Sequence, residues 1–102
     1  MENSVDLDYE FITRLKNLPF VEKIILFGSR ARGDQASRSD IDLAIVCPQA
    51  SESEWFDLLQ IIDTADTLLK IDCVRFDELP AEAILKKNIE TDGVTLYEKN
   101  SI

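Results

Sequence analysis

The chain contains no histidine, and its 102 residues include only two cysteines, three glycines and three prolines. Without histidine it cannot form a Ser-His-Asp triad, and Cys47 and Cys73 are not a CxxC pair, so zinc chemistry is excluded as well. Basic residues are also scarce, 11 against 20 acidic ones, which gives a formal net charge of −9. This charge repels phosphate backbones, so it disfavours direct binding to nucleic acid and favours a basic partner.

Long hydrophobic runs are missing too. No stretch approaches the roughly 18 apolar residues of a membrane span, and the acidic start lacks the features of a secretory signal. We therefore expect a cytoplasmic protein with no membrane association. The chain is 45% hydrophobic and 30% charged, which is typical of a globular protein. Its length suits one domain over residues 1–102.

The spacing of apolar residues predicts alternating helices and strands. Helices are expected at residues 7–18, 51–69 and 80–90, and strands at residues 21–27, 41–46, 70–76 and 94–98. Ser51 and Glu54 form the sequence signature of a capping box at the start of the second helix. The order of elements predicts an α/β fold, a small mixed β-sheet covered by helices on one face.

Two aspartates lie at the start of the apolar strand predicted at residues 41–46, one just before it and one within it. Asp40 and Asp42 are two residues apart, so in an extended strand their side chains leave the same face about 6.5–7 Å apart. Carboxylates that lose hydration without a partner cost several kcal/mol each, so a cation is expected between them. Oxygen ligands of this kind favour magnesium or manganese.

A third aspartate, Asp72, lies between apolar residues of the strand at 70–76. If that strand lies beside the strand at 41–46, Asp72 can point to the same face as the other two acids. The alternate positions would then face the helices: Ile41, Leu43, Ile45, Cys47, Ile71 and Cys73. Three carboxylates on one face can hold two divalent ions about 3.5–4 Å apart, an arrangement used in phosphoryl displacement.

The loop between the first two strands suits a phosphate. Gly28 lets the backbone approach a ligand closely, and the Ser29 hydroxyl and nearby amides can donate hydrogen bonds to it. Three of the five arginines follow within the loop, Arg30, Arg32 and Arg38, with one acid, Asp34. A basic patch next to three acids suits a metal-bound triphosphate.

These residues resemble a known family. Gly28-Ser29, ten intervening residues, and Asp40-x-Asp42 are similar to the signature of the polymerase-beta-like nucleotidyltransferase superfamily. The fuller pattern GSRARG…SDIDLAI resembles its minimal members, the MNT proteins. The resemblance covers a catalytic core at about residues 21–76 and implies the polymerase-beta-like nucleotidyltransferase fold.

The resemblance also implies roles for individual residues. Gly28 and Ser29 would hold the phosphates of ATP, and Arg32 matches a basic position of the family. Asp40, Asp42 and Asp72 would ligate two Mg²⁺ ions as the catalytic acids. Asp72 would also activate the acceptor hydroxyl.

Minimal members resemble antitoxins that transfer AMP from ATP to a small helical HEPN-family toxin, with tyrosine as the expected acceptor. The implied function is therefore that of a protein adenylyltransferase and antitoxin that forms a hetero-oligomer with its toxin. Two alternatives stay open. The chain could neutralise its partner by binding alone, or it could modify a small molecule such as an aminoglycoside.

Overall fold

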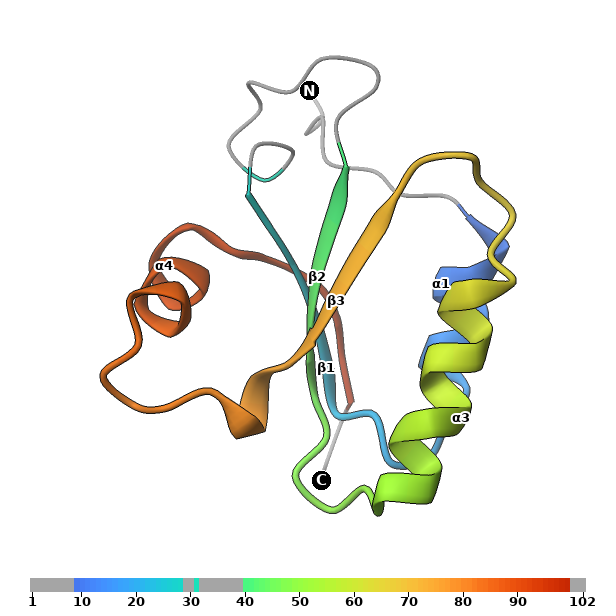
Figure 1. Ribbon diagram of the computed structural model, residues 1–102, viewed down its shortest axis with the longest axis horizontal. Coiled ribbons are helices and arrows are strands. Elements are labelled where there is room, and N and C mark those ends of the chain that lie inside the picture. The colour runs from blue at the N-terminus through green and yellow to red at the C-terminus, as the bar shows by residue number, and fades with distance from the viewer. Residues whose placement is uncertain (1–8, 29–30, 32–39, 100–102) are drawn as a thin grey trace.

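The computed structural model of the protein describes residues 9–28, 31 and 40–99. Four strands form one sheet in the order β3-β2-β1-β4, with helices on both sides of it (Figure 1). In chain order the elements are α1 (Glu10–Lys16), β1 (Lys23–Phe27), β2 (Ile41–Val46), α3 (Glu52–Asp63), β3 (Ile71–Arg75), the 3₁₀ turn η1 (Phe76–Glu78), α4 (Ile84–Asp92) and β4 (Val94–Glu98).

The sheet is mixed, as the sequence predicts. β1 pairs antiparallel with both β2 and β4, whereas β2 and β3 run parallel. Parallel neighbours need a crossover connection, because a tight hairpin reverses the chain direction. That crossover contains α3, whose first turn has the predicted capping box between Ser51 and Glu54.

One face of the sheet carries the main core. Figure 1 shows α1 and α3 together on this side. The sheet residues beneath them are almost fully buried: Ile24, Leu26, Ile41, Leu43, Ile45 and Cys47. Ile71 and Cys73 of β3 pack against the same cluster. The side-chain alternation predicted for β2 and β3 is therefore confirmed, because every second residue of each strand faces this core.

The opposite face is partly covered by α4, which the sequence analysis did not place there. Ile89 of this helix is buried with Ile25 and Ala44 of the sheet in a second, smaller core. The helix presents one apolar stripe and is only nine residues long. It therefore covers part of this face, and Asp42 and Asp72 remain half-exposed.

The three predicted helices are all shorter than their periodicity suggests. α3 ends at Asp63, although the apolar spacing continues to Leu69. α4 begins at Ile84 and not at Pro80. The Ala83 amide donates a hydrogen bond to the Pro80 carbonyl and closes a turn there, and Ala83 itself has an extended backbone conformation, so the helix starts only after it. α1 ends at Lys16, two residues before the end of the predicted range 7–18, of which residues 7 and 8 lie outside the described ones. No helix in the described ranges is long and apolar enough to span a bilayer.

Candidate functional site

The acidic residues lie in a row across the sheet. Asp42 of β2 pairs with Phe27 of β1 on one side and with Asp72 of β3 on the other. Residues that pair directly across neighbouring strands project to the same face. Asp42 and Asp72 therefore share the face on which α4 lies, and the exposed Asp40 immediately precedes β2.

The charge of this row is only partly compensated. Burial, followed by the negative charges of Asp72 and Asp40, raises the pKa of Asp42, and hydrogen bonding between the Asp42 and Asp72 carboxyl groups acts in the same direction. Lys70 opposes this effect, with its Nζ 3.7 Å from Asp72 Oδ1. Among the described residues, one lysine faces three carboxylates, so this part of the site carries an excess of negative charge.

The donor set suits a hard divalent cation. Carboxylate oxygens are the ligands that Mg²⁺ prefers, and a cation would relieve the repulsion between Asp42 and Asp72. In the part of the chain that the structure describes, no three acidic or thiol side chains already converge into a metal centre. The fold therefore brings two carboxyl groups together and leaves the third, Asp40, exposed beside them.

Position 28 requires a glycine for two reasons, its backbone conformation and the space around it. Its φ of +79° lies in the left-handed region, and a Cβ atom there would overlap the Asp42 carboxylate. Only glycine fits a left-handed turn this close to another side chain. Ser29 and Arg32, together with Arg30 and Arg38, lie outside the described residues.

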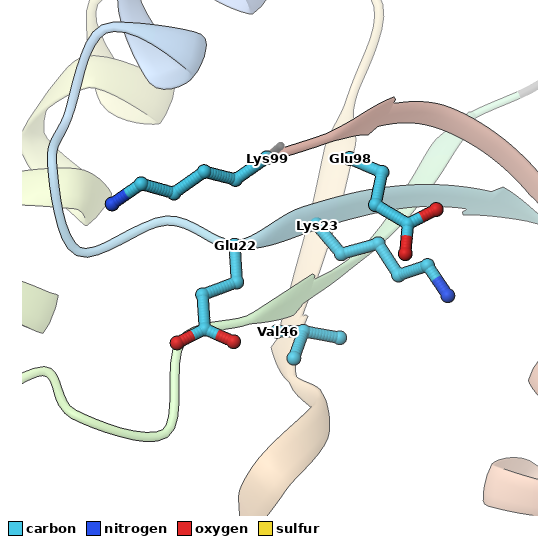
Figure 2. Close-up of a pocket in the computed structure, with 5 residues that line it drawn as sticks. All are labelled: Glu22, Lys23, Val46, Glu98 and Lys99. Atoms are coloured by element: carbon cyan, nitrogen blue, oxygen red, sulfur yellow. The ribbon is translucent and has the colours of Figure 1, made fainter. Parts of the chain in front are cut away.

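Two cavities must be distinguished. One of about 290 Å³ lies beside Gly28, between the end of β1 and α4. A larger one of about 390 Å³ lies at the other end of the strands, where β1 begins and β2 and β4 end (Figure 2). Lys99 extends there away from Glu98 and donates a hydrogen bond to the Pro19 carbonyl at 2.9 Å. The larger cavity is remote from the acids and forms no part of this site.

Two contributions to the site were not predicted from the sequence. Lys70 precedes Asp72 by two residues, and this spacing along an extended segment could have indicated a shared face. Leu85, Asn88 and Asp92 of α4 line the smaller cavity. Their spacing of three and four residues could have indicated one side of a helix, but nothing local could have indicated which side of the sheet that helix covers.

The two cysteines play no part in this arrangement. Both are free thiols, Cys47 fully buried and Cys73 half-buried. Burial raises the pKa of Cys47 to about 11 and that of Cys73 to about 12. Because the thiolate is the reactive form, both side chains are inert at neutral pH.

Comparison with known proteins identifies the arrangement. Residues 10–102 match the family described as polymerase beta, nucleotidyltransferase. A candidate protein adenylyltransferase of Methanocaldococcus jannaschii is 32% identical over 80 residues, which cover 76% of this chain and 79% of that protein.

Solved structures agree with the sequence match. A chain of a toxin–antitoxin crystal structure with AMP-PNP superposes with a TM-score of 0.64 and 26% identity, over 91% of this chain and 75% of that one. A chain from the complex of a tri-AMPylated Shewanella oneidensis HEPN toxin with its MNT antitoxin has a TM-score of 0.59 at 21% identity, over 88% and 69%. Because the identity in the second match is so low, this match shows only that the two chains share a fold.

Proposed function

Because the chain belongs to the polymerase beta nucleotidyltransferase family, we propose that it transfers AMP from magnesium-ATP to a hydroxyl group of a protein partner. We propose that the partner is a HEPN-family toxin and that a tyrosine of the toxin accepts the AMP. This modification would neutralise the toxin. The observation that carries this proposal is the pairing of Asp42 with Asp72 on one face of the sheet, beside the left-handed Gly28. The relatives named as an adenylyltransferase and as toxin–antitoxin complexes support it.

Asp40, Asp42 and Asp72 are the residues that would hold two Mg²⁺ ions. When bound, such ions neutralise charge on the phosphates and stabilise the attacking and leaving oxygens of an in-line displacement. Gly28 would let the phosphates approach the backbone closely, since it carries no side chain. Ser29 and Arg32 would contribute a hydroxyl donor and a positive charge.

The reaction needs one proton acceptor. The acceptor oxygen forms a bond to the α-phosphorus, the bond from that phosphorus to the bridging oxygen breaks, and pyrophosphate leaves. The hydroxyl proton passes to a carboxylate, for which we propose Asp72. Its side chain is 46% exposed and belongs to an edge strand, so a tyrosine of a docked partner can reach it, whereas Asp42 is on the inner strand β2.

The test is an Asp42→Asn variant. Asparagine keeps the shape of the side chain and removes its charge, so AMP transfer to the partner should fall by roughly a hundredfold or more. Folding should persist, and in metal-free buffer the variant should be at least as stable as the parent, because its repulsion with Asp72 is gone. Mass spectrometry of the partner after incubation with ATP and Mg²⁺ measures the added AMP, and calorimetric melting measures stability.

The matched control is Asp57→Asn, the same change at an exposed position of α3. It should transfer AMP like the parent chain. Undiminished labelling by the Asp42 variant would refute the proposed roles of the acids. A parent chain that neutralises its partner without adding AMP would instead be a non-catalytic antitoxin, and labelling of an aminoglycoside would indicate a small-molecule transferase.

A further inference from the structure

The cavity between β1 and α4 has a composition unlike that of the acidic row. Its volume of about 290 Å³ is near the lower end of small-molecule sites. Phe27 and Gly28 line it from the end of β1, and Leu85, Asn88 and Asp92 line it from α4. The three helix residues lie three and four positions apart, so they form one continuous side of the helix.

This cavity is continuous with the acidic row. Phe27 is the direct strand partner of Asp42, and the Cα atom of Gly28 lies against the Asp42 carboxylate. The row therefore runs from Asp72 through Asp42 to Phe27 and the cavity. A ligand held by one end at the acids can place its other end against α4.

The lining indicates which end of a nucleotide fits there. Asp92 is acidic and has no described cation as a partner among the residues of the cavity, so it repels phosphate. Its carboxylate is, however, an acceptor for hydroxyl groups, and the Asn88 amide offers a donor and an acceptor together. Phe27 and Leu85 provide apolar surface for the face of a ring.

We infer that this cavity takes the nucleoside part of the nucleotide, with Asn88 selecting adenine and Asp92 accepting hydrogen bonds from ribose hydroxyls. The inference rests on the proposed function, since it assumes that the phosphates lie at the acids. An amide complements the amino group and neighbouring ring nitrogen of adenine, a donor next to an acceptor. Guanine presents a different pattern, so the same amide discriminates against it.

The decisive variant is Asn88→Asp. A carboxylate only accepts hydrogen bonds, so it opposes the adenine pattern and matches the ring N–H and amino donors of guanine. Titration calorimetry with ATP and with GTP, each with Mg²⁺, should show the ratio of the two Kd values shifting toward GTP by roughly tenfold or more. Asn88 is exposed on its helix, so the variant should fold.

Asp92 is tested by Asp92→Asn. The parent chain should bind ATP more tightly than dideoxy-ATP, which lacks both ribose hydroxyls, and the variant should lose most of that difference. Neutralising an acid in the last turn of a helix removes an unfavourable interaction with the helix dipole. A loss of ATP affinity in this variant would therefore not reflect unfolding.

Two matched controls lie on α3, on the other side of the sheet. Gln60→Glu makes the same amide-to-acid change as the Asn88 variant, and Asp63→Asn neutralises the last residue of a helix, as at Asp92. Both should bind ATP, GTP and dideoxy-ATP like the parent chain. If the Asn88 and Asp92 variants behave like these controls, the inference is wrong while the proposed function stands.

The remaining outcomes separate the two claims. No binding of either nucleotide by the parent chain would overturn both. The expected shift in nucleotide preference, without AMP transfer to the partner, would support the cavity assignment and refute the transfer. Unchanged ATP binding combined with weaker partner binding by the Asn88 and Asp92 variants would make this surface a docking site for the toxin and overturn the inference.

Discussion

Asp42 and Asp72 are held in an unfavourable arrangement, beside a glycine, Gly28, whose backbone conformation other residues adopt only at a cost. Gly28 is the one described residue with a positive φ, and the two carboxyl groups face each other with one lysine nearby. Facing like charges cost free energy, and a left-handed backbone costs free energy at any residue other than glycine. Such arrangements concentrate at functional sites. Their occurrence together, on adjacent strands, is the physical sign that this face binds something.

A Gly28→Ala variant should lose both stability and nucleotide binding. A left-handed alanine costs about 1–2 kcal/mol, and its methyl group would also press on the Asp42 carboxylate. We expect the free energy of unfolding to fall by at least that amount in urea denaturation, and ATP binding to be lost in calorimetry. An unchanged urea midpoint would show that the turn relaxes without cost.

The elements keep their positions through a few long-range side-chain contacts. Arg75 at the end of β3 donates hydrogen bonds to the carbonyls of Cys47 at 3.2 Å and Ala50 at 2.6 Å, and Asp77 accepts one from the Cys47 amide at 2.6 Å. These bonds fasten the connection after β2 to β3. They help to keep β3 beside β2, and thus Asp72 beside Asp42.

α1 is capped by a residue from another part of the chain. Its own N-cap, Tyr9, makes no side-chain capping bond, and the Asp66 carboxylate accepts hydrogen bonds from the amides of Glu10 at 3.1 Å and Phe11 at 3.3 Å instead. The bond from the Glu10 amide, followed by those from Asp66 itself and Phe11, lowers the pKa of Asp66 below 3.8.

The Asp66 contact should make stability depend on pH. The pKa of Asp66 is lower in the folded protein than its value of 3.8 in the unfolded chain, so its ionised form stabilises the fold at pH values above 3.8. This stabilisation is lost as the pH falls through the lower, folded pKa. Asp66→Asn should therefore melt at a lower temperature than the parent at neutral pH, and the two curves should converge in acid. Parallel melting curves at every pH would contradict this role.

The whole molecule is strongly acidic, with a net charge of −9, and this bears on its partner. A surface of one sign attracts a partner of the other sign and speeds encounter at low ionic strength. The acidic site residues add to this field on the face that carries the proposed acceptor site. The charge therefore favours a partner with a basic surface, which is what we expect of the proposed toxin.

Association with the proposed toxin partner should consequently depend on salt. Raising the salt from about 0.05 M to about 0.5 M shortens the screening length severalfold, so the association rate measured by stopped flow should fall by roughly tenfold or more, with a smaller change in dissociation. Salt-independent association would show that apolar contacts alone bring the two proteins together.

Much of the site could be predicted from the sequence, because its signals are local. Alternation along β2 and β3 separates Asp42 and Asp72 from Ile41 and Cys73, whatever the rest of the chain does. The capping box at Ser51 is equally local. The metal roles of Asp40, Asp42 and Asp72 stay predictions. So do the phosphate roles of Gly28, Ser29 and Arg32, the last two of which lie outside the described residues.

What the sequence determined by itself was which side chains share a strand face, and it supplied the candidates for the residues that carry the chemistry. Only the tertiary structure decided that Asp42 lies opposite Asp72, that Gly28 touches Asp42, and that α4 brings Asn88 to the acidic side of the sheet. Local patterns follow from the fixed geometry of strands and helices. Contacts between segments far apart in the chain decide which strands become neighbours and which face a short helix covers. The local spacing of residues does not encode those contacts.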